Sequence, residues 1–181
     1  MHRLPLLSLF ALLALLAGCG GGDGTAPAAP APSLADNSAN RKQVVLLYPS
    51  EKDGLLAPFA SAVEISETPQ QEMTGLLRAY LSTVPGGNMV NPFPERTALR
   101  AFYLEENGRA VVDLDQWAFE GGGTDTETYR IYGMINTICY NYPEIRSVKV
   151  LVDGQERETL LGHIDLLNYI PPEPSLNGKL Q

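Results

Sequence analysis

The chain has 181 residues, of which 44% are hydrophobic, and its formal net charge is −8. Nucleic-acid binding requires clustered basic residues that neutralise phosphates, so 13 Lys and Arg against 21 Asp and Glu argue against a nucleic-acid partner. The length suffices for one domain with its own hydrophobic core.

The first 19 residues have the order of an export signal. A charged start is followed by an apolar run over Leu4–Ala17, which ends in Leu16–Ala17–Gly18–Cys19. The run is too short to cross a bilayer, whose core needs about 20 residues. The tetrad resembles the lipobox of bacterial lipoproteins, and this resemblance implies cleavage before Cys19 and lipidation of that residue. We therefore predict a signal peptide over residues 1–18 and a lipid anchor in the membrane at Cys19.

Residues 19–42 are predicted to be a disordered tether, because Gly, Ala and Pro dominate and little can be buried. With Cys19 lipidated, Cys139 would have no disulfide partner. Gly20 follows the lipidated residue, where an aspartate would have indicated retention in the inner membrane. We expect an outer-membrane anchor facing the periplasm in a cell with two membranes, and otherwise the outer face of the cytoplasmic membrane.

The folded part is predicted to cover residues 43–170, with a proline-containing tail over 171–181. It begins with two strands. Val44–Tyr48 is a short apolar run closed by a proline, and Phe59–Ile65 alternates in the manner of a half-buried strand.

The first helix has sequence signals at both ends. Thr68 is a good N-cap, Pro69 suits the first helical position, and Gln71 completes a capping box with Thr68. Apolar residues then recur at helical spacing until Val84–Gly87 stops the pattern. An irregular loop is expected over residues 86–96.

A β-hairpin and a later strand are predicted in the second half of the chain. Asn107–Gly108 is the preferred pair of a type I′ turn, and Leu99–Leu104 and Ala110–Leu114 are strand-like on either side of it. Val148–Val152 alternates with Lys149 as a half-buried strand.

The second helix is expected to follow the glycines at 121–123. Thr124 and Glu127 have the spacing of another capping box, and Pro143 ends the pattern. The elements together predict the α/β, or more narrowly α+β, class. We expect a single compact domain with a mixed β-sheet that carries two main helices on one face.

Four segments of the predicted domain bear a family signature. They are LLYPSEKDGLLAPF, FYLEENGRAVVDL, GGGTDTETYRIYGMINTICYNYPEI and SVKVLVDGQERETLLGHIDL. In this order they resemble a GerMN domain, the module named for a spore-germination protein and found in many envelope lipoproteins. The resemblance implies a fold similar to the ring-building motifs of envelope assembly complexes, and a non-enzymatic role. The stretch VPGGNMVNPFPER departs from the family pattern.

The sequence offers few groups for catalysis. His163 is the single histidine that remains after removal of residues 1–18, which excludes two-histidine zinc motifs, and no GxSxG elbow is present. For His163 and the nearby Asp165 we expect hydrogen bonds that stabilise a turn, with a ligand contact as the alternative. Cys139 lies on an apolar helix face, where core packing is expected. The carboxylate of Asp113 is expected to point outward into a solvated acidic surface, with a calcium site as the alternative.

A second stripe on the later helix carries Tyr129, Tyr132, Asn136 and Tyr140. Tyrosines combine apolar area with a polar tip and are enriched at interfaces, so these four residues are candidates for binding a partner. The alternative is that a loop or the C-terminal tail covers them. Trp117 and Phe119 are expected to pack at the edge of the core.

These observations predict a membrane-anchored lipoprotein without enzymatic activity, cofactor or metal. Its domain would bind other envelope proteins, or a second copy of itself, in the assembly or positioning of an envelope complex. A sporulation or germination role is implied by the family resemblance alone. An envelope module that binds a small molecule or a glycan is the alternative, with a pocket lined by Trp117, Phe119 or the tyrosines. A hydrolase is the least favoured interpretation.

Overall fold

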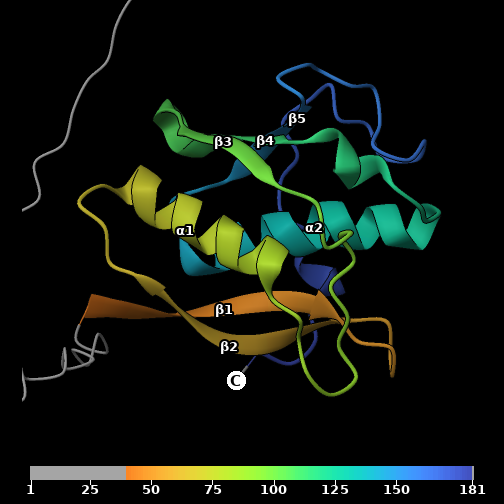
Figure 1. The fold of residues 1–181 in the computed structure, drawn as a ribbon, viewed down its shortest axis with the longest axis horizontal. Helices are drawn as coiled ribbons and strands as arrows, with labels where there is room; N and C mark the ends of the chain where they lie inside the picture. The colour runs from red at the N-terminus through yellow and green to blue at the C-terminus, as the bar shows by residue number, and fades with distance from the viewer. Residues whose placement is uncertain (1–39, 181) are drawn as a thin grey trace, which may run out of the picture. The chain divides into compact units, whose positions relative to one another are not determined.

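The computed structural model describes residues 40–180, so the predicted signal peptide, Cys19 and most of the predicted tether lie outside the described residues. Figure 1 labels the strands and the two long helices. In chain order they are β1 (Arg41–Pro49), β2 (Leu56–Glu64), α1 (Pro69–Ser82), β3 (Leu99–Leu104), β4 (Arg109–Leu114), α2 (Thr124–Asn141) and β5 (Ser147–Val152).

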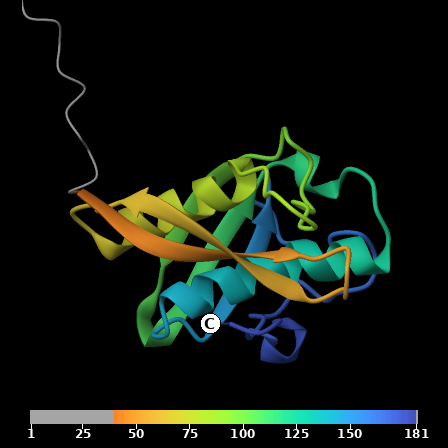
Figure 2. The same ribbon diagram turned by 90° about the horizontal axis from the view of Figure 1, so that it is seen from below.

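The strands form two separate sheets with the helices between them. β1 and β2 pair in antiparallel register, whereas β4 is antiparallel to β3 and parallel to β5. Helix α2 makes the crossover that the parallel pair requires. Figures 1 and 2 show α1 and α2 with the β1–β2 hairpin on one side and the three-stranded sheet on the other. The predicted α+β class, with a mixed sheet carrying two helices on one face, is confirmed, and the first two strands lie on the opposite side of the helices.

The core fills the space between these layers. The rings of Tyr48 and Tyr80 stack at 4.8 Å, and the Tyr48 hydroxyl donates to the Tyr80 carbonyl at 2.6 Å. The same core cluster contains fully buried side chains from every layer, among them Leu46, Leu76, Leu77, Val112, Leu114, Ile131, Met134, Ile135, Ile138 and Val150.

Local signals determine the start of α1 and the turn of the hairpin. The Gln71 amide donates to Thr68 Oγ1 at 3.3 Å, and the Thr68 amide donates back to Gln71 Oε1 at 3.3 Å, which confirms the capping box. Asn107 (φ 63°) and Gly108 (φ 71°) both have the left-handed backbone that a type I′ turn needs. A Cβ on Gly108 would lie 2.3 Å from the Glu144 carbonyl oxygen, so no larger residue fits there.

Side chains of α2 cover the outer edge of β1. The Val45 amide donates to Asn141 Oδ1 at 2.9 Å, and Asn141 Nδ2 donates to the Val45 carbonyl at 2.7 Å. The Leu47 amide donates to Thr137 Oγ1 at 2.9 Å. These bonds satisfy backbone groups that an exposed edge strand would leave open to pairing with another chain.

Two polar residues that were expected to face solvent are buried, so those expectations are wrong. Asp113 Oδ1 accepts from the Gly154 amide at 2.8 Å, and Lys149 Nζ donates to the Leu167 carbonyl. The reason is that the segment 153–170 returns to the sheet, where the amide of Ile170 donates to the Val148 carbonyl at 2.9 Å. Alternation along a strand cannot reveal such a cover.

Within residues 40–180, no helix has the length and apolarity needed to span a bilayer.

Candidate partner-binding surface

Helix α2 starts differently from the sequence expectation. Gly121 (φ 65°) and Gly122 (φ 106°) reverse the chain, and Gly123 is the N-cap, without a side-chain cap bond. The predicted capping box of Thr124 and Glu127 is therefore wrong. The capping box does not form because the Glu127 side chain is buried and bonds to residues 160–163, which are distant in the sequence.

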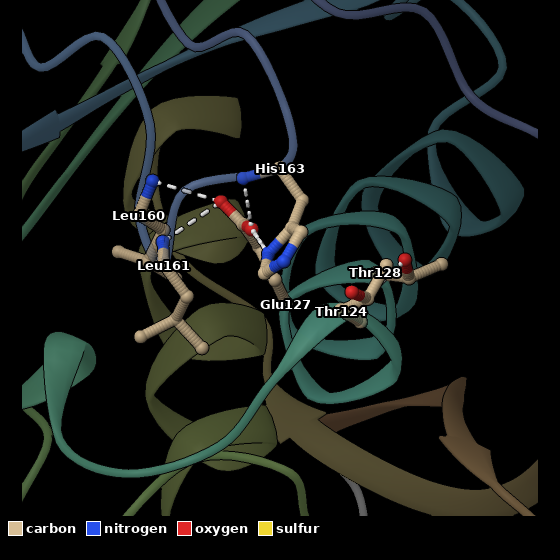
Figure 3. Close-up of polar contacts among 6 residues, drawn as sticks. All are labelled: Thr124, Glu127, Thr128, Leu160, Leu161 and His163. Atoms are coloured by element: carbon tan, nitrogen blue, oxygen red, sulfur yellow. Dashed lines mark hydrogen bonds and ion pairs between the residues drawn. The ribbon is translucent and has the colours of Figure 1, made fainter.

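The Glu127 carboxylate is fully buried and accepts four hydrogen bonds from one loop (Figure 3). Oε1 accepts from the amides of Leu160 and Leu161 at 2.9 and 2.8 Å. Oε2 accepts from the amide of His163 at 2.7 Å and lies 2.9 Å from its ring Nδ1. Figure 3 shows Thr124 and Thr128 beside each other and apart from these contacts. Burial by itself would raise the pKa of Glu127, but these donors outweigh it and hold the pKa below its ordinary value.

This arrangement anchors a loop and leaves no free carboxylate oxygen for chemistry. The expected turn-stabilising hydrogen bonds of His163 and Asp165 are confirmed, because Asp165 accepts from the Leu167 amide at 2.8 Å and from Asn168 Nδ2 at 3.0 Å. The structure does not join His163 and Asp165 into a catalytic pair, since each bonds to different groups.

Arg130 is a structural residue that sequence reasoning missed. Its side chain is 4% exposed and donates to three backbone carbonyls, those of Pro92, Ala118 and Glu120, each at 2.8 Å. Burial lowers the pKa of the guanidinium. The available signal was the spacing of Glu127 and Arg130, which puts two charges three residues apart on the apolar side of a helix.

The four residues of the predicted tyrosine stripe differ in burial and in hydrogen-bond partners. Asn136 is 2% exposed, and its amide bonds to Glu173 and Asn177 of the C-terminal segment, as the alternative interpretation expected. The Tyr129 hydroxyl donates to the Gly54 carbonyl at 2.9 Å. Tyr132 is half-buried, and Tyr140 remains exposed.

Phe119 and Cys139 lie at the edge of the core as expected, whereas Trp117 is 37% exposed and lies outside the core cluster. The Arg96 guanidinium lies 3.8 Å from the ring centre of Trp117, and Phe119 is partly buried against the core cluster. Cys139 is also partly buried, and burial raises the pKa of its thiol to about 11. Such a thiol is a poor nucleophile at neutral pH.

The loop after α1 is held in place at several points. Asn91 Nδ2 donates to the carbonyls of Tyr80, Leu81 and Thr83 at 2.9, 3.2 and 3.0 Å, which caps the C-terminal end of α1. Two further backbone bonds tie the loop to the β1–β2 turn. The Val90 amide donates to the Pro49 carbonyl at 3.1 Å, and the Glu51 amide donates to the Asn88 carbonyl at 2.8 Å.

This fixed loop exposes apolar side chains and borders two grooves. Val84 is 81% exposed and Val90 is 41% exposed. One groove of about 510 Å³ lies between the end of α1 and the loop, and a second of about 290 Å³ lies between the loop, the β1–β2 turn and α2. Val90 lines both. We call this region the loop surface, and it consists of residues 83–95 together with Pro49, Ser50, Glu51, Gly54, Thr126 and Tyr129.

A larger groove of about 730 Å³ lies between β2 and α1. Most of its lining is polar or charged, including Glu64, Glu67 and Arg78, and Ile65 is its exposed large apolar residue. Binding interfaces are centred on apolar anchors, so the loop surface is the better candidate.

Comparisons with known proteins agree with this fold. A family model described as Germane, sporulation and spore germination, matches residues 46–158. A structure described as a "putative lipoprotein" from Clostridium perfringens is 20% identical, with a TM-score of 0.54 over 80% of this chain and 98% of that one. The tandem GerMN domains of the sporulation protein GerM from Bacillus subtilis are 16% identical, with a TM-score of 0.56 over 81% of this chain and 51% of theirs.

The first GerMN domain of the same Bacillus subtilis protein is 14% identical, with a TM-score of 0.55 over 72% of this chain and 97% of that one. None of the curated proteins matches the sequence. At these identities the solved structures show the fold alone, and with the family match they confirm the resemblance to a GerMN domain.

Proposed function

The chain belongs to the Germane family of sporulation and spore-germination proteins, and from this premise we propose that it is a lipid-anchored envelope protein whose domain binds another envelope protein. Binding would assemble or position a complex and involve no covalent chemistry. The lipid would hold the domain at the outer membrane facing the periplasm, or at the outer face of the cytoplasmic membrane in a cell with one membrane.

Support for the anchor comes from the sequence and from one relative. Leu16–Cys19 has the lipobox order, and the Clostridium perfringens structure, described as a "putative lipoprotein", is matched over almost its whole length. The first strand begins at Arg41, so about 20 residues separate Cys19 from the domain. A disordered Gly- and Pro-containing tether of that length, as predicted from the sequence, would have a mean span of roughly 25 Å, enough to lift the domain off a bilayer.

The observation that carries the binding role is the exposure of Val84 and Val90 on a loop fixed by hydrogen bonds. Both side chains are exposed to solvent, although hydrogen bonds hold the backbone of their loop to the end of α1 and to the β1–β2 turn. Val84 and Val90 belong to a group of apolar residues that gathers around the two grooves, and an exposed apolar patch is a feature of protein-binding surfaces. The groups with catalytic potential, Glu127, His163 and Cys139, are all engaged in the internal structure.

The anchor is tested in the native host by fractionating cells that carry Cys19→Ser. We expect this variant to move from the membrane to the soluble fraction. Cys139→Ser is the matched control, because it removes the other cysteine and should leave the protein in the membrane. A Cys19→Ser protein that stays with the membrane would overturn the anchor.

The binding role is tested by chemical cross-linking of the full chain in its native membranes. We expect an adduct with a second envelope protein, identified by mass spectrometry. Turnover of a peptidoglycan or lipid substrate by the purified protein, abolished by one substitution, would instead show an enzyme.

The alternative of a small-molecule or glycan site is favoured by one observation. The groove beside Val84 has a volume of about 510 Å³, within the range of small-ligand pockets. A ligand that binds the folded state raises the unfolding temperature, so a clear upward shift with peptidoglycan fragments would support this alternative.

A further inference from the structure

The loop surface has the shape and charge to select the chemistry of its partner. We propose that it binds a segment of a partner protein that inserts an apolar side chain beside Val90 and carries lysine or arginine around that side chain. This inference rests on the proposed function that the domain binds an envelope protein. It adds the surface used and the chemical nature of the bound segment.

The surface is ordered before any partner arrives. Asn91 fixes the loop to α1, and Arg130 of α2 holds the carbonyl of Pro92. Phe93 is buried beneath the loop, where its ring lies edge-on to that of Tyr80. Because the loop is already ordered, it loses little conformational entropy when a partner binds, which favours binding.

The apolar centre of the surface is Val90, because it lines both grooves. On one side lie Val84 and Met89, and on the other lie Pro49 and Pro92. An apolar side chain that enters either groove would make contacts on both of its flanks. Such central, flanked positions are where interface energy concentrates.

Carboxylates surround this centre. Glu51 and Glu95 line the two grooves, and Asp125 precedes Thr126 at the edge of one of them. All three are exposed, and none takes part in the ion pairs found within residues 40–180. Lys52 is a basic neighbour in the β1–β2 turn, so the rim retains net negative charge.

Charge complementarity then selects among the possible occupants. A second copy of this chain that used the same surface would bring like charges together, which costs binding energy. Anionic lipid headgroups would be repelled in the same way. A segment with basic residues around an apolar one satisfies both the rim and the grooves.

The experiment places a photoreactive residue on the full chain in its native membranes. Val90→p-benzoylphenylalanine is compared with Ile65→p-benzoylphenylalanine, which lies in the polar groove and is exposed to a similar extent, 47% against 41%. We expect adducts with a second protein from position 90 and not from position 65. Mass spectrometry of the adduct should find lysine or arginine within a few residues of the apolar side chain that is captured.

Charge reversal provides the second arm. Glu51→Lys combined with Glu95→Lys should lower the adduct yield from position 90 by about tenfold, because attraction of the basic segment becomes repulsion. Both residues are exposed, so the thermal unfolding midpoint should stay close to that of the unmodified chain. An unchanged yield in this folded variant would overturn the proposed charge selection.

The remaining outcomes separate this inference from the proposed function. Adducts from position 90 with a second copy or with lipid would overturn the basic partner. Adducts from position 65 alone would overturn the surface and still support partner binding. A lack of adducts from both positions would count against the proposed function as well.

Discussion

Replacing Glu127 by glutamine tests whether the buried carboxylate stabilises the loop over residues 160–163. The change keeps the size of the side chain and removes its charge. The two carboxylate oxygens together accept four hydrogen bonds. In glutamine, an NH₂ group replaces one of these oxygens. That group cannot accept from the donors that face it, so a backbone amide in the interior loses its partner.

The size of the effect follows from the number of donors affected. An unsatisfied buried donor costs about 1–3 kcal/mol. The ring of His163 is 41% exposed and can bond to water after the change, which reduces its share of the loss. We therefore expect Glu127→Gln to lower the free energy of unfolding by about 2–3 kcal/mol at pH 7. For a domain of this size, that corresponds to a drop in Tm of about 5–10 °C.

The pH dependence gives an independent check. The pKa of Glu127 is lower in the folded protein than its ordinary value of 4.5. The carboxylate therefore stabilises the fold fully above pH 4.5, and this contribution is lost as the pH falls below that value. Glutamine does not titrate, so the difference between the two proteins should shrink below pH 4.5.

The assay is urea unfolding followed by circular dichroism, at pH 7 and at pH 3.5. Glu106→Gln is the matched control, because Glu106 is exposed at the hairpin turn and should shift stability by less than about 0.5 kcal/mol. If Glu127→Gln unfolds at the same urea concentration as the unmodified chain at pH 7, the structural role given to this carboxylate is wrong.

Three further predictions concern the helices. Arg130→Met should lower the free energy of unfolding by about 2–4 kcal/mol, because three carbonyls lose their donor and that of Ala118 is buried; urea unfolding measures this loss. Gly133→Ala should lower the free energy of unfolding by about 1–3 kcal/mol, because the new Cβ would lie 2.5 Å from the hydroxyl of Tyr80. Gly75→Ala should raise the free energy of unfolding by about 0.5–1 kcal/mol, because its Cβ would meet nothing within 4 Å. The thiol of Cys139, with its pKa raised to about 11, should react with iodoacetamide at pH 8 about a hundredfold more slowly than free cysteine.

Each of these predictions has a contrary result. An Arg130→Met protein of undiminished stability would mean that solvent replaces the lost donors. Equal effects of the two alanine substitutions would show that Tyr80 moves freely within the core. Rapid alkylation of Cys139 in the folded protein would show that its helix opens often.

The sequence predicted elements whose signals are local. Thr68 and Gln71 meet within one helical turn, and Asn107 and Gly108 form their turn by themselves. The prediction of a capping box at the start of α2 was wrong, although Thr124 and Glu127 have the same spacing as Thr68 and Gln71. Glu127 instead bonds to residues more than 30 positions away in the sequence. No local rule distinguishes a capping carboxylate from one that binds a distant loop.

The candidate surface was harder to predict than the fold. The tyrosine stripe pointed to α2, and Tyr129 does line one of the grooves of the loop surface. Asn136 shares that stripe, yet the C-terminal segment covers it. The loop over 83–95 gave no periodic signal, because its shape depends on Asn91 and on Arg130 of another element.

Helix α2 binds segments from the whole length of the domain, through side chains that reach Gly54, Pro92, Leu160 and Glu173. A chain that is synthesised from its N-terminus therefore cannot complete this set of contacts until Glu173 and Asn177 have emerged. Resistance to proteases should consequently arise late and in a single step. A truncation near residue 172 should loosen the middle of the molecule as well as its end.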